Sequence, residues 1–247
     1  MSSLEIKLKA ISAQSILDVA TGRGNALDTL IAAAPENAMV VGVDLSRLGM
    51  ATARDNYPSL TLQLAQMDAS HLGFAAGTFD LVSISMSLHH LDELEVVLRD
   101  MLRVLRVGGH LLVAEMYRDV DSPQQLTHVL LHDWWAEIDL GQGKPHFPTF
   151  ERKQIGRILD GLGLEEEWMS EISGPADDDP TDPDRVDMLL NVCDEYIRRA
   201  EDNPHAEALI ARGQQLKERV ATIGLRWAPA VVYLGRKGSS TSGGGSS

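Results

Sequence analysis

The sequence has a single cysteine, Cys193, among its 247 residues, so no disulfide can form within the chain. Chains without disulfides are typical of reducing compartments. Long apolar runs are missing as well, since none approaches the roughly 20 residues that cross a bilayer. The first residues, MSSLEIKLKAI, lack the apolar core of a signal peptide. We therefore expect a cytoplasmic protein with no membrane partner.

Basic side chains are also scarce. Lysine and arginine number 22 against 36 aspartates and glutamates, which gives a formal charge of −14. A nucleic-acid surface needs a basic patch, so no nucleic-acid partner is expected. The hydrophobic share of 44% over 247 residues is enough for one generous α/β domain with a large core.

One stretch, ILDVATGRGNAL at residues 16–27, organises the rest of the chain. An apolar strand ends there at small residues and continues as a helix, a turn in which backbone N–H groups can approach a ligand. Asp44 closes the next apolar run, VVGVD, and a carboxylate at the end of a second strand is placed to accept both hydroxyls of a ribose. The pattern predicts a nucleoside-binding βαβ unit.

The details of this stretch indicate which class of nucleoside-containing ligand it binds. The dinucleotide fingerprint requires a small residue three positions after its second glycine, but Leu27 stands there after Gly24. A phosphate-binding loop ending in Gly-Lys-Ser/Thr is also missing. The stretch resembles the first motif of class I S-adenosylmethionine-dependent methyltransferases, within the small-molecule branch that includes quinone-biosynthesis enzymes. Ala20 departs from the glycine more common in that motif.

Later motifs continue the resemblance to about residue 237. They are MDASHL after a strand expected at residues 60–64, FDLVSISMSLHHL at 79–91, RVLRVGGHLLVAE at 103–115 and a last strand, APAVVYLGRK. The resemblance implies an α/β fold with a Rossmann-like, twisted, seven-stranded sheet, helices on both faces and an antiparallel last strand.

The same resemblance sets the expected domain organisation. Residues 1–237 are expected to form a single methyltransferase domain with helical cap insertions. One is a cap segment at 118–149 after the fifth strand. The other, at 175–226, combines an acidic linker with a helical hairpin between the sixth and seventh strands, which would form a lid or a dimer interface. Residues 238–247, GSSTSGGGSS, are expected to be a disordered linker or tag tail.

The family's cofactor lies across the carboxyl ends of the first, second and fourth strands. By resemblance, two glycines allow close backbone approach, Asp44 binds the ribose, Asp68 with Ala69 binds adenine, and the start of the first motif and the end of the fourth strand hold the methionine part. The residues expected to bind S-adenosylmethionine are Asp18, Ala20, Gly22, Gly24, Asp44, Leu45, Asp68, Ala69, Ile84 and Ser85.

Two histidines are candidates for catalysis. His89 and its neighbour His90 follow the fourth strand, where a methyl acceptor would enter, and His132 lies in the cap segment. Imidazole titrates near neutral pH and can take a proton from an acceptor. We expect His89 and His132 to act in catalysis. The alternative is that such histidines cap or pack the neighbouring helix.

The cap segment contains a helix that begins with a Ser122-Pro123 cap. Its helical period places Leu126, Leu130, Trp134 and Ile138 on one apolar face, and His128, His132, Trp135 and Asp139 on a second strip. We expect the second strip to line an acceptor pocket, with substrate-binding residues Tyr117, His128, Trp135 and His146. A solvated face or a subunit contact, and thus a homodimer, is the alternative.

His128 and His132 also have the i, i+4 spacing that can place two ligands on one metal ion, with Asp139 or His146 completing the site. The glutamate motif or cysteine pair that usually accompanies this spacing is missing, so no metal is expected. The predicted function is in-line transfer of a methyl group from S-adenosylmethionine to a small-molecule acceptor. An NAD-dependent oxidoreductase and a non-catalytic S-adenosylmethionine-binding module are the alternatives.

Overall fold

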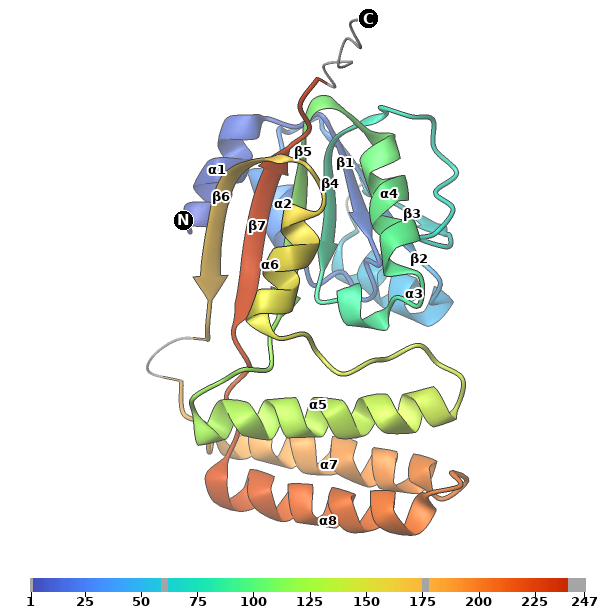
Figure 1. Ribbon diagram of the computed structural model, residues 1–247, viewed down its shortest axis with the longest axis vertical. Helices are drawn as coiled ribbons and strands as arrows, with labels where there is room; N and C mark the ends of the chain where they lie inside the picture. Colours follow the sequence, from blue (N-terminus) through green and yellow to red (C-terminus); the bar gives the residue numbers. More distant parts are fainter. Residues whose placement is uncertain (1, 59–61, 175–177, 240–247) are drawn as a thin grey trace, which may run out of the picture.

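The computed structural model describes residues 2–58, 62–174 and 178–239, and its centre is one mixed β-sheet (Figure 1). The strand order is β3-β2-β1-β4-β5-β7-β6. Strand β7 is antiparallel to both β5 and β6, while the other pairs are parallel. The expected seven-stranded Rossmann-like sheet with an antiparallel last strand is confirmed. Its strands are β1 (Ser15–Val19), β2 (Met39–Asp44), β3 (Leu62–Gln66), β4 (Phe79–Ser85), β5 (Leu105–Met116), β6 (Glu165–Ile172) and β7 (Ala230–Arg236).

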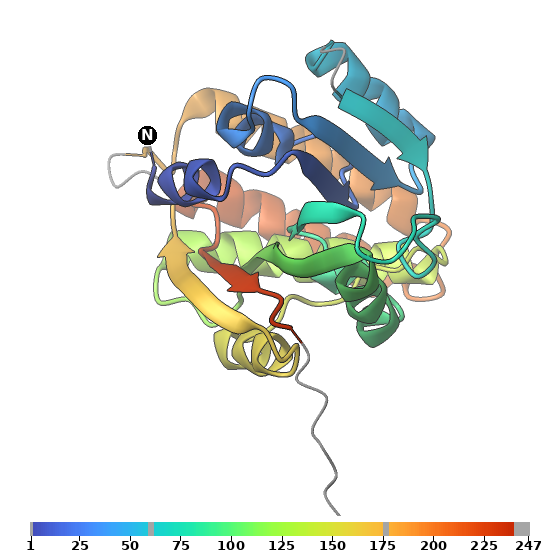
Figure 2. The ribbon, with the colours of Figure 1, turned by 90° about the horizontal axis from the view of Figure 1, so that it is seen from above.

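The central strands are buried on both faces, which explains why their sequences are continuous apolar runs rather than alternating ones. Helices α1 (Ser3–Ile11), α2 (Leu27–Ala33) and α3 (Arg47–Asn56) pack on one face. Helices α4 (Leu94–Val104) and α6 (Arg152–Asp160) pack on the other, as the view from above shows (Figure 2). The sheet therefore separates two apolar cores.

A third core lies outside the sheet, below the carboxyl ends of the parallel strands (Figure 1). It is a three-helix layer made of α5 (Pro123–Gly141), α7 (Pro183–Ala200) and α8 (Ala206–Ile223). Trp134 is fully buried at its centre, and its indole Nε1 donates to the Leu209 carbonyl at 2.9 Å. Gly213 makes room for this ring, since a Cβ there would lie 2.5 Å from Trp134. The segment after β5 and the hairpin between β6 and β7 thus pack as one unit.

Two details differ from the sequence-based expectations. The apolar face expected on α5 is only half buried: Trp134 and Ile138 are enclosed, but Leu126 and Leu130 are 39% and 36% exposed. The reason is that α7 and α8 cover one side of α5 and the sheet domain covers another, which leaves a third strip to solvent.

Strand β3 runs two residues further than expected, to Gln66, and the start of its expected range, 60–61, lies outside the described residues. Most of the expected tail, 240–247, and part of the acidic linker, 175–177, also lie outside the described residues.

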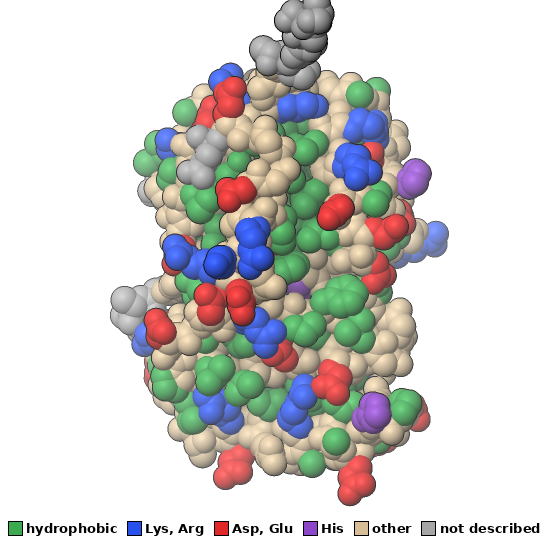
Figure 3. Space-filling model, viewed as in Figure 1, with side chains coloured by type: hydrophobic (Ala, Val, Ile, Leu, Met, Phe, Trp, Pro, Cys, Tyr) green, Lys and Arg blue, Asp and Glu red, His purple; other side chains and the backbone are tan. Residues whose placement is uncertain are grey.

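Charge is mixed on the surface. On the face drawn in Figure 3, Lys and Arg side chains are interspersed with Asp and Glu side chains over both the sheet domain and the three-helix layer. Among the described residues, none of the helices combines the length and apolar character needed to cross a membrane.

Candidate functional site

The turn after β1 has the backbone geometry that close ligand approach requires. Ala20, Gly22 and Gly24 all have positive φ, at 55°, 51° and 88°. Gly24 is also sterically required, because a Cβ there would lie 2.9 Å from the Tyr57 ring. The turn therefore needs glycine for two of its three left-handed positions, and the third is occupied by an alanine.

Ala20→Gly should stabilise the protein. A non-glycine residue in the left-handed region costs about 1–2 kcal/mol, which glycine avoids at a smaller entropic cost. We expect the free energy of unfolding in urea to rise by about 0.5–1 kcal/mol. Ala51→Gly, on exposed helical backbone in α3, is the matched control and should lower it by about 1 kcal/mol. Equal effects of the two substitutions would contradict this account.

Asp44 connects the turn to the end of β2. Its Oδ2 accepts from the Gly22 amide at 2.8 Å and its Oδ1 accepts from the Ser46 amide at 2.7 Å. Each carboxylate oxygen retains a second lone pair, because a carboxylate has about four acceptor sites. The two backbone amides thus hold the carboxylate in a fixed orientation beside the turn.

Asp68 follows β3 at the same edge of the sheet. Both the backbone amide and the hydroxyl of Ser70 donate to its Oδ1 at 2.8 Å. These bonds hold the pKa of Asp68 below its usual value. Among the described contacts its Oδ2 has no donor, so this oxygen is available to a ligand's amino group.

Between these elements lies a cavity of about 480 Å³, at the carboxyl ends of β1 and β2. The chain runs to opposite sides of the sheet from β1 and β4, and such a switch point is where open α/β sheets bind ligands. Six of the expected cofactor residues line the cavity: Ala20, Gly22, Asp44, Leu45, Asp68 and Ala69. Other lining residues were not singled out from the sequence: Met67, Ser70, Met86, Ser87, Leu91, Asp92, Glu93, Val97 and Pro145.

The remaining expected cofactor residues lie behind the cavity wall. Gly24 packs on Tyr57, and Met86 and Ser87 line the cavity in place of Ile84 and Ser85. Met86 has a φ of 49°, which turns the chain at the end of β4. A positive φ at a methionine leaves no sequence signal, which is why this part of the wall was missed.

Asp18 is buried beneath the turn rather than in the cavity. Its carboxylate accepts from the hydroxyls of Thr21 and Ser83, both at 2.7 Å. Burial raises the pKa of Asp18 to about 6, against the opposing effect of these two hydrogen bonds. Asp18 thus orders the turn and β4 from below.

The raised pKa of Asp18 predicts a pH dependence of stability. The folded state holds this proton more tightly than the unfolded chain, so the group's contribution is fully present below about pH 4 and is lost as the pH rises through about 6. Asp18→Asn removes the titration. The stability of the variant relative to the wild type should therefore increase by about 3 kcal/mol between pH 4 and pH 8. Urea unfolding at both pH values tests this, and a pH-independent difference would contradict it.

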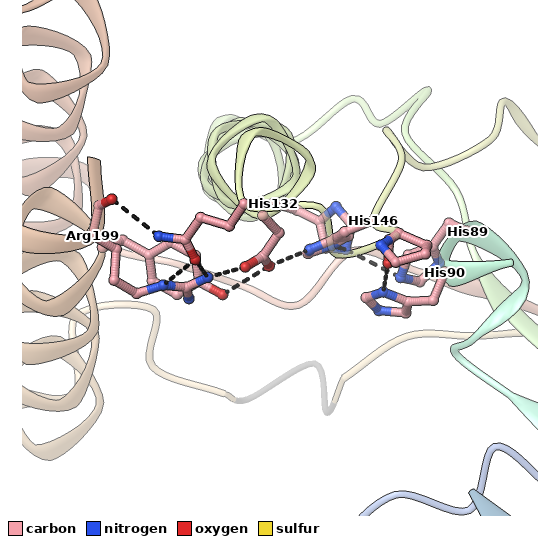
Figure 4. Close-up of polar contacts among 9 residues, drawn as sticks. His89, His90, His132, His146 and Arg199 are labelled. Atoms are coloured by element: carbon pink, nitrogen blue, oxygen red, sulfur yellow. Dashed lines mark hydrogen bonds and ion pairs between the residues drawn. The ribbon is translucent and has the colours of Figure 1, made fainter. Parts of the chain in front are cut away.

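A row of polar side chains runs from the three-helix layer to the end of β5 (Figure 4). On α7, Arg199 forms an ion pair with Asp139. Asp139 Oδ2 accepts from His146 Nδ1 at 2.8 Å. The Nε2 of His146 and the Nε2 of His89 lie 3.1 and 3.2 Å from the Nε2 of His132. The two candidate catalytic residues, His89 and His132, are therefore in direct contact.

Glu115 closes this row at the end of β5. Its carboxylate accepts from His89 Nδ1 at 2.8 Å and from the backbone amides of Leu88 and Met116 at 2.7 and 2.9 Å. Burial and the neighbouring imidazoles hold the pKa of His132 well below its usual range, so His132 is neutral. The nearest imidazole to the cavity is that of His90, which lines it.

The residues expected to bind the acceptor are separated by the structure. His146 lies in the row just described, but the Tyr117 hydroxyl donates to Glu171 at 2.9 Å, and His128 Nδ1 accepts from the Ala228 amide at 2.9 Å. Trp135 packs near Tyr196, with ring centroids 5.7 Å apart. None of these three lines the cavity. Helical spacing alone placed His128 and Trp135 on one strip and could not show which neighbours each meets.

Comparison with known proteins bears on the first half of the chain. Residues 17–113 match a family model described as a methyltransferase domain. A ubiquinone/menaquinone biosynthesis C-methyltransferase of Haemophilus ducreyi is 33% identical over 114 residues, 44% of each chain. A demethylmenaquinone methyltransferase of Porphyromonas gingivalis is 31% identical over 120 residues, 47% of this chain and 49% of that one. The chain thus matches less than half the length of these curated relatives.

The fold extends the likeness beyond the matched sequence. The crystal structure of an S-adenosylmethionine-dependent methyltransferase from Aquifex aeolicus superposes with a TM-score of 0.52 at 17% identity, covering 69% of this chain and 84% of that one. The sequence match therefore confirms the resemblance over residues 17–113, and the superposition confirms the fold.

Proposed function

We propose that this chain is a class I S-adenosylmethionine-dependent methyltransferase that transfers the sulfonium methyl group of that cofactor to a small molecule. The observation that carries the proposal is the cavity at the switch point of the sheet, with Asp44 and Asp68 on its wall. Asp44 is held by two amides with lone pairs free for both ribose hydroxyls, and Asp68 Oδ2 is free for the adenine amino group. The exposed Leu45 side chain offers an apolar surface beside the adenine ring.

The acceptor is proposed to approach from the side of His90 and Pro145. These two residues line the cavity at its edge toward the three-helix layer, and His90 Nδ1 lies 3.4 Å from the Pro145 carbonyl. Methyl transfer from a sulfonium is an in-line displacement, which depends mainly on alignment of donor and acceptor and on exclusion of water. The three-helix layer would supply that exclusion, with His89 and His132 positioned behind His90.

The acceptor is proposed to differ from those in the names of the two relatives. One name specifies ubiquinone/menaquinone biosynthesis and the other specifies demethylmenaquinone. The family match ends at residue 113, before α5, α7 and α8 begin. The part of the chain that follows the match, with Pro145 on the cavity wall, is therefore the part proposed to determine the acceptor.

Calorimetric titration with S-adenosylmethionine, its demethylated product and NAD tests the proposal. Binding of the first two without NAD is the expected result. Binding of NAD alone would support the oxidoreductase instead. Binding of S-adenosylmethionine without methyl transfer to any of a panel of small phenols, quinols, thiols and amines would favour a non-catalytic binding module.

A further inference from the structure

Four histidines from three separate segments converge beside the cavity (Figure 4). His89 and His90 belong to the short helix η1 (Leu88–His90), His132 belongs to α5, and His146 lies in the loop after α5. One nitrogen from each lies within 4.8 Å of the others. All except His90 are buried. The cofactor contacts described above give no role to four imidazoles gathered at one point.

The spacing of the nitrogens fits a metal ion. His132 Nε2 lies 3.2 Å from His89 Nε2 and 3.1 Å from His146 Nε2. A tetrahedral ion with metal–nitrogen distances of 2.0–2.1 Å separates its ligand atoms by about 3.3–3.4 Å. Small adjustments of these rings would therefore place all three nitrogens at bonding distance from one centre.

The orientation of the rings supports the same conclusion. His89 Nδ1 faces the Glu115 carboxylate and His146 Nδ1 faces the Asp139 carboxylate, both at 2.8 Å. A carboxylate accepts, so each Nδ1 carries a proton, and the Nε2 of such a ring in its neutral form presents a lone pair. His132 Nε2 carries at most one proton, so it can donate to only one of the two Nε2 lone pairs that face it. Carboxylate–histidine pairs of this kind orient the imidazole ligands of metal sites.

We propose that His89, His132 and His146 bind a divalent transition-metal ion of the zinc class through their Nε2 atoms. Imidazole nitrogen is a preferred ligand for zinc and its first-row neighbours, and three protein ligands leave one position of the tetrahedron open. The Glu115 and Asp139 carboxylates offset the charge of the ion. His90, the exposed member, stands beside the open position.

The open position is proposed to face the cavity, whose wall includes His90 and Pro145. An acceptor atom with a lone pair, such as an oxygen, would take this position beside the methyl donor. This last step rests on the proposed function, whereas the ion site itself does not.

The test is titration of the chelator-treated full chain with zinc alone. One ion per chain should bind, and Co²⁺ in its place should give the intense visible bands of a four-coordinate ion. His132→Ala and His146→Gln, on different elements, should each weaken zinc binding at least about 100-fold, since each removes one of three ligands. His205→Ala, an exposed histidine outside the cluster, is the matched control and should bind as the wild type does. Circular dichroism shows whether each variant is folded.

Two outcomes would overturn the proposal. One is a folded wild-type chain that binds no zinc and shows no rise in melting temperature with it. The other is undiminished binding by both folded variants. His90→Ala should keep the ion, and its loss in that variant would overturn the three-ligand assignment. Failure of S-adenosylmethionine to bind a zinc-loaded chain would contradict the proposed function but leave the ion site standing.

Discussion

Asp44→Ala should lower the affinity for S-adenosylmethionine by about 100-fold. The carboxylate is expected to accept two hydrogen bonds from the ribose, and bonds to a charged group contribute about 1.5–3 kcal/mol each. Losing about 3 kcal/mol corresponds to a 100-fold change in the dissociation constant. Calorimetric titration with the cofactor and with its demethylated product measures the change, which should be the same for both because the ribose is common to them.

The control must separate the loss of hydrogen bonds to the ribose from any disturbance of the turn after β1. Asp44 also accepts from the amides of Gly22 and Ser46, so its removal disturbs the backbone that shapes the cavity. Asp44→Asn keeps one acceptor oxygen and nearly the same shape, and should show an intermediate loss. Asp55→Ala, an exposed carboxylate on α3, should leave the affinity unchanged. Wild-type affinity in Asp44→Ala would contradict the ribose assignment.

Six residues of the cavity wall could be predicted from the sequence because their signals are local. A strand, a turn of small residues and a helix follow one another directly in residues 16–27, and Asp44 ends the next strand. Parallel strands bring their carboxyl ends to one edge, so short motifs in chain order lead to a shared cavity. The seven strands and the antiparallel last strand followed from the resemblance to the methyltransferase family, and the structure confirms both.

The histidine cluster could not be predicted in the same way, because its members are distant in sequence. His132 meets His89 across 43 positions and His146 across 14. Helical spacing had paired His132 with His128, but His128 turns to the Ala228 amide instead. Glu115, which orients His89, gave no more signal than any acidic residue at the end of a strand.

The three-helix layer shows a second limit of sequence patterns. The two segments that build it are separated by α6 and β6, and each was read as an insertion of its own. Periodicity identifies an apolar face but not its partner. Helix α5 is covered on two sides, so a single face could not describe its burial.

Trp134→Ala should destabilise the protein by about 3–5 kcal/mol, the range for removing a large buried aromatic side chain. Its ring is fully buried in the core of the three-helix layer, and Gly213 of α8 is fitted to it. The substitution also removes the hydrogen bond to the Leu209 carbonyl. Since small domains are stable by only about 5–15 kcal/mol, this loss is a large part of the total. Urea unfolding followed by circular dichroism measures it.

Trp227→Ala removes the same side chain from a site that is 43% exposed, where the ring touches His128 with centroids 4.8 Å apart. A loss of about 1 kcal/mol or less is expected there, as for substitutions away from a packed core. Equal losses at the two tryptophans would contradict the packing described for α5, α7 and α8.

Trp134→Ala should also affect ligand binding, because His132 lies on α5 two residues before Trp134. Loosening the three-helix layer should lower the affinity for any ligand held by His132 more than it lowers the affinity for the cofactor at Asp44. Comparing zinc and S-adenosylmethionine titrations of Trp134→Ala therefore separates the support of the histidine cluster from the support of the cofactor cavity.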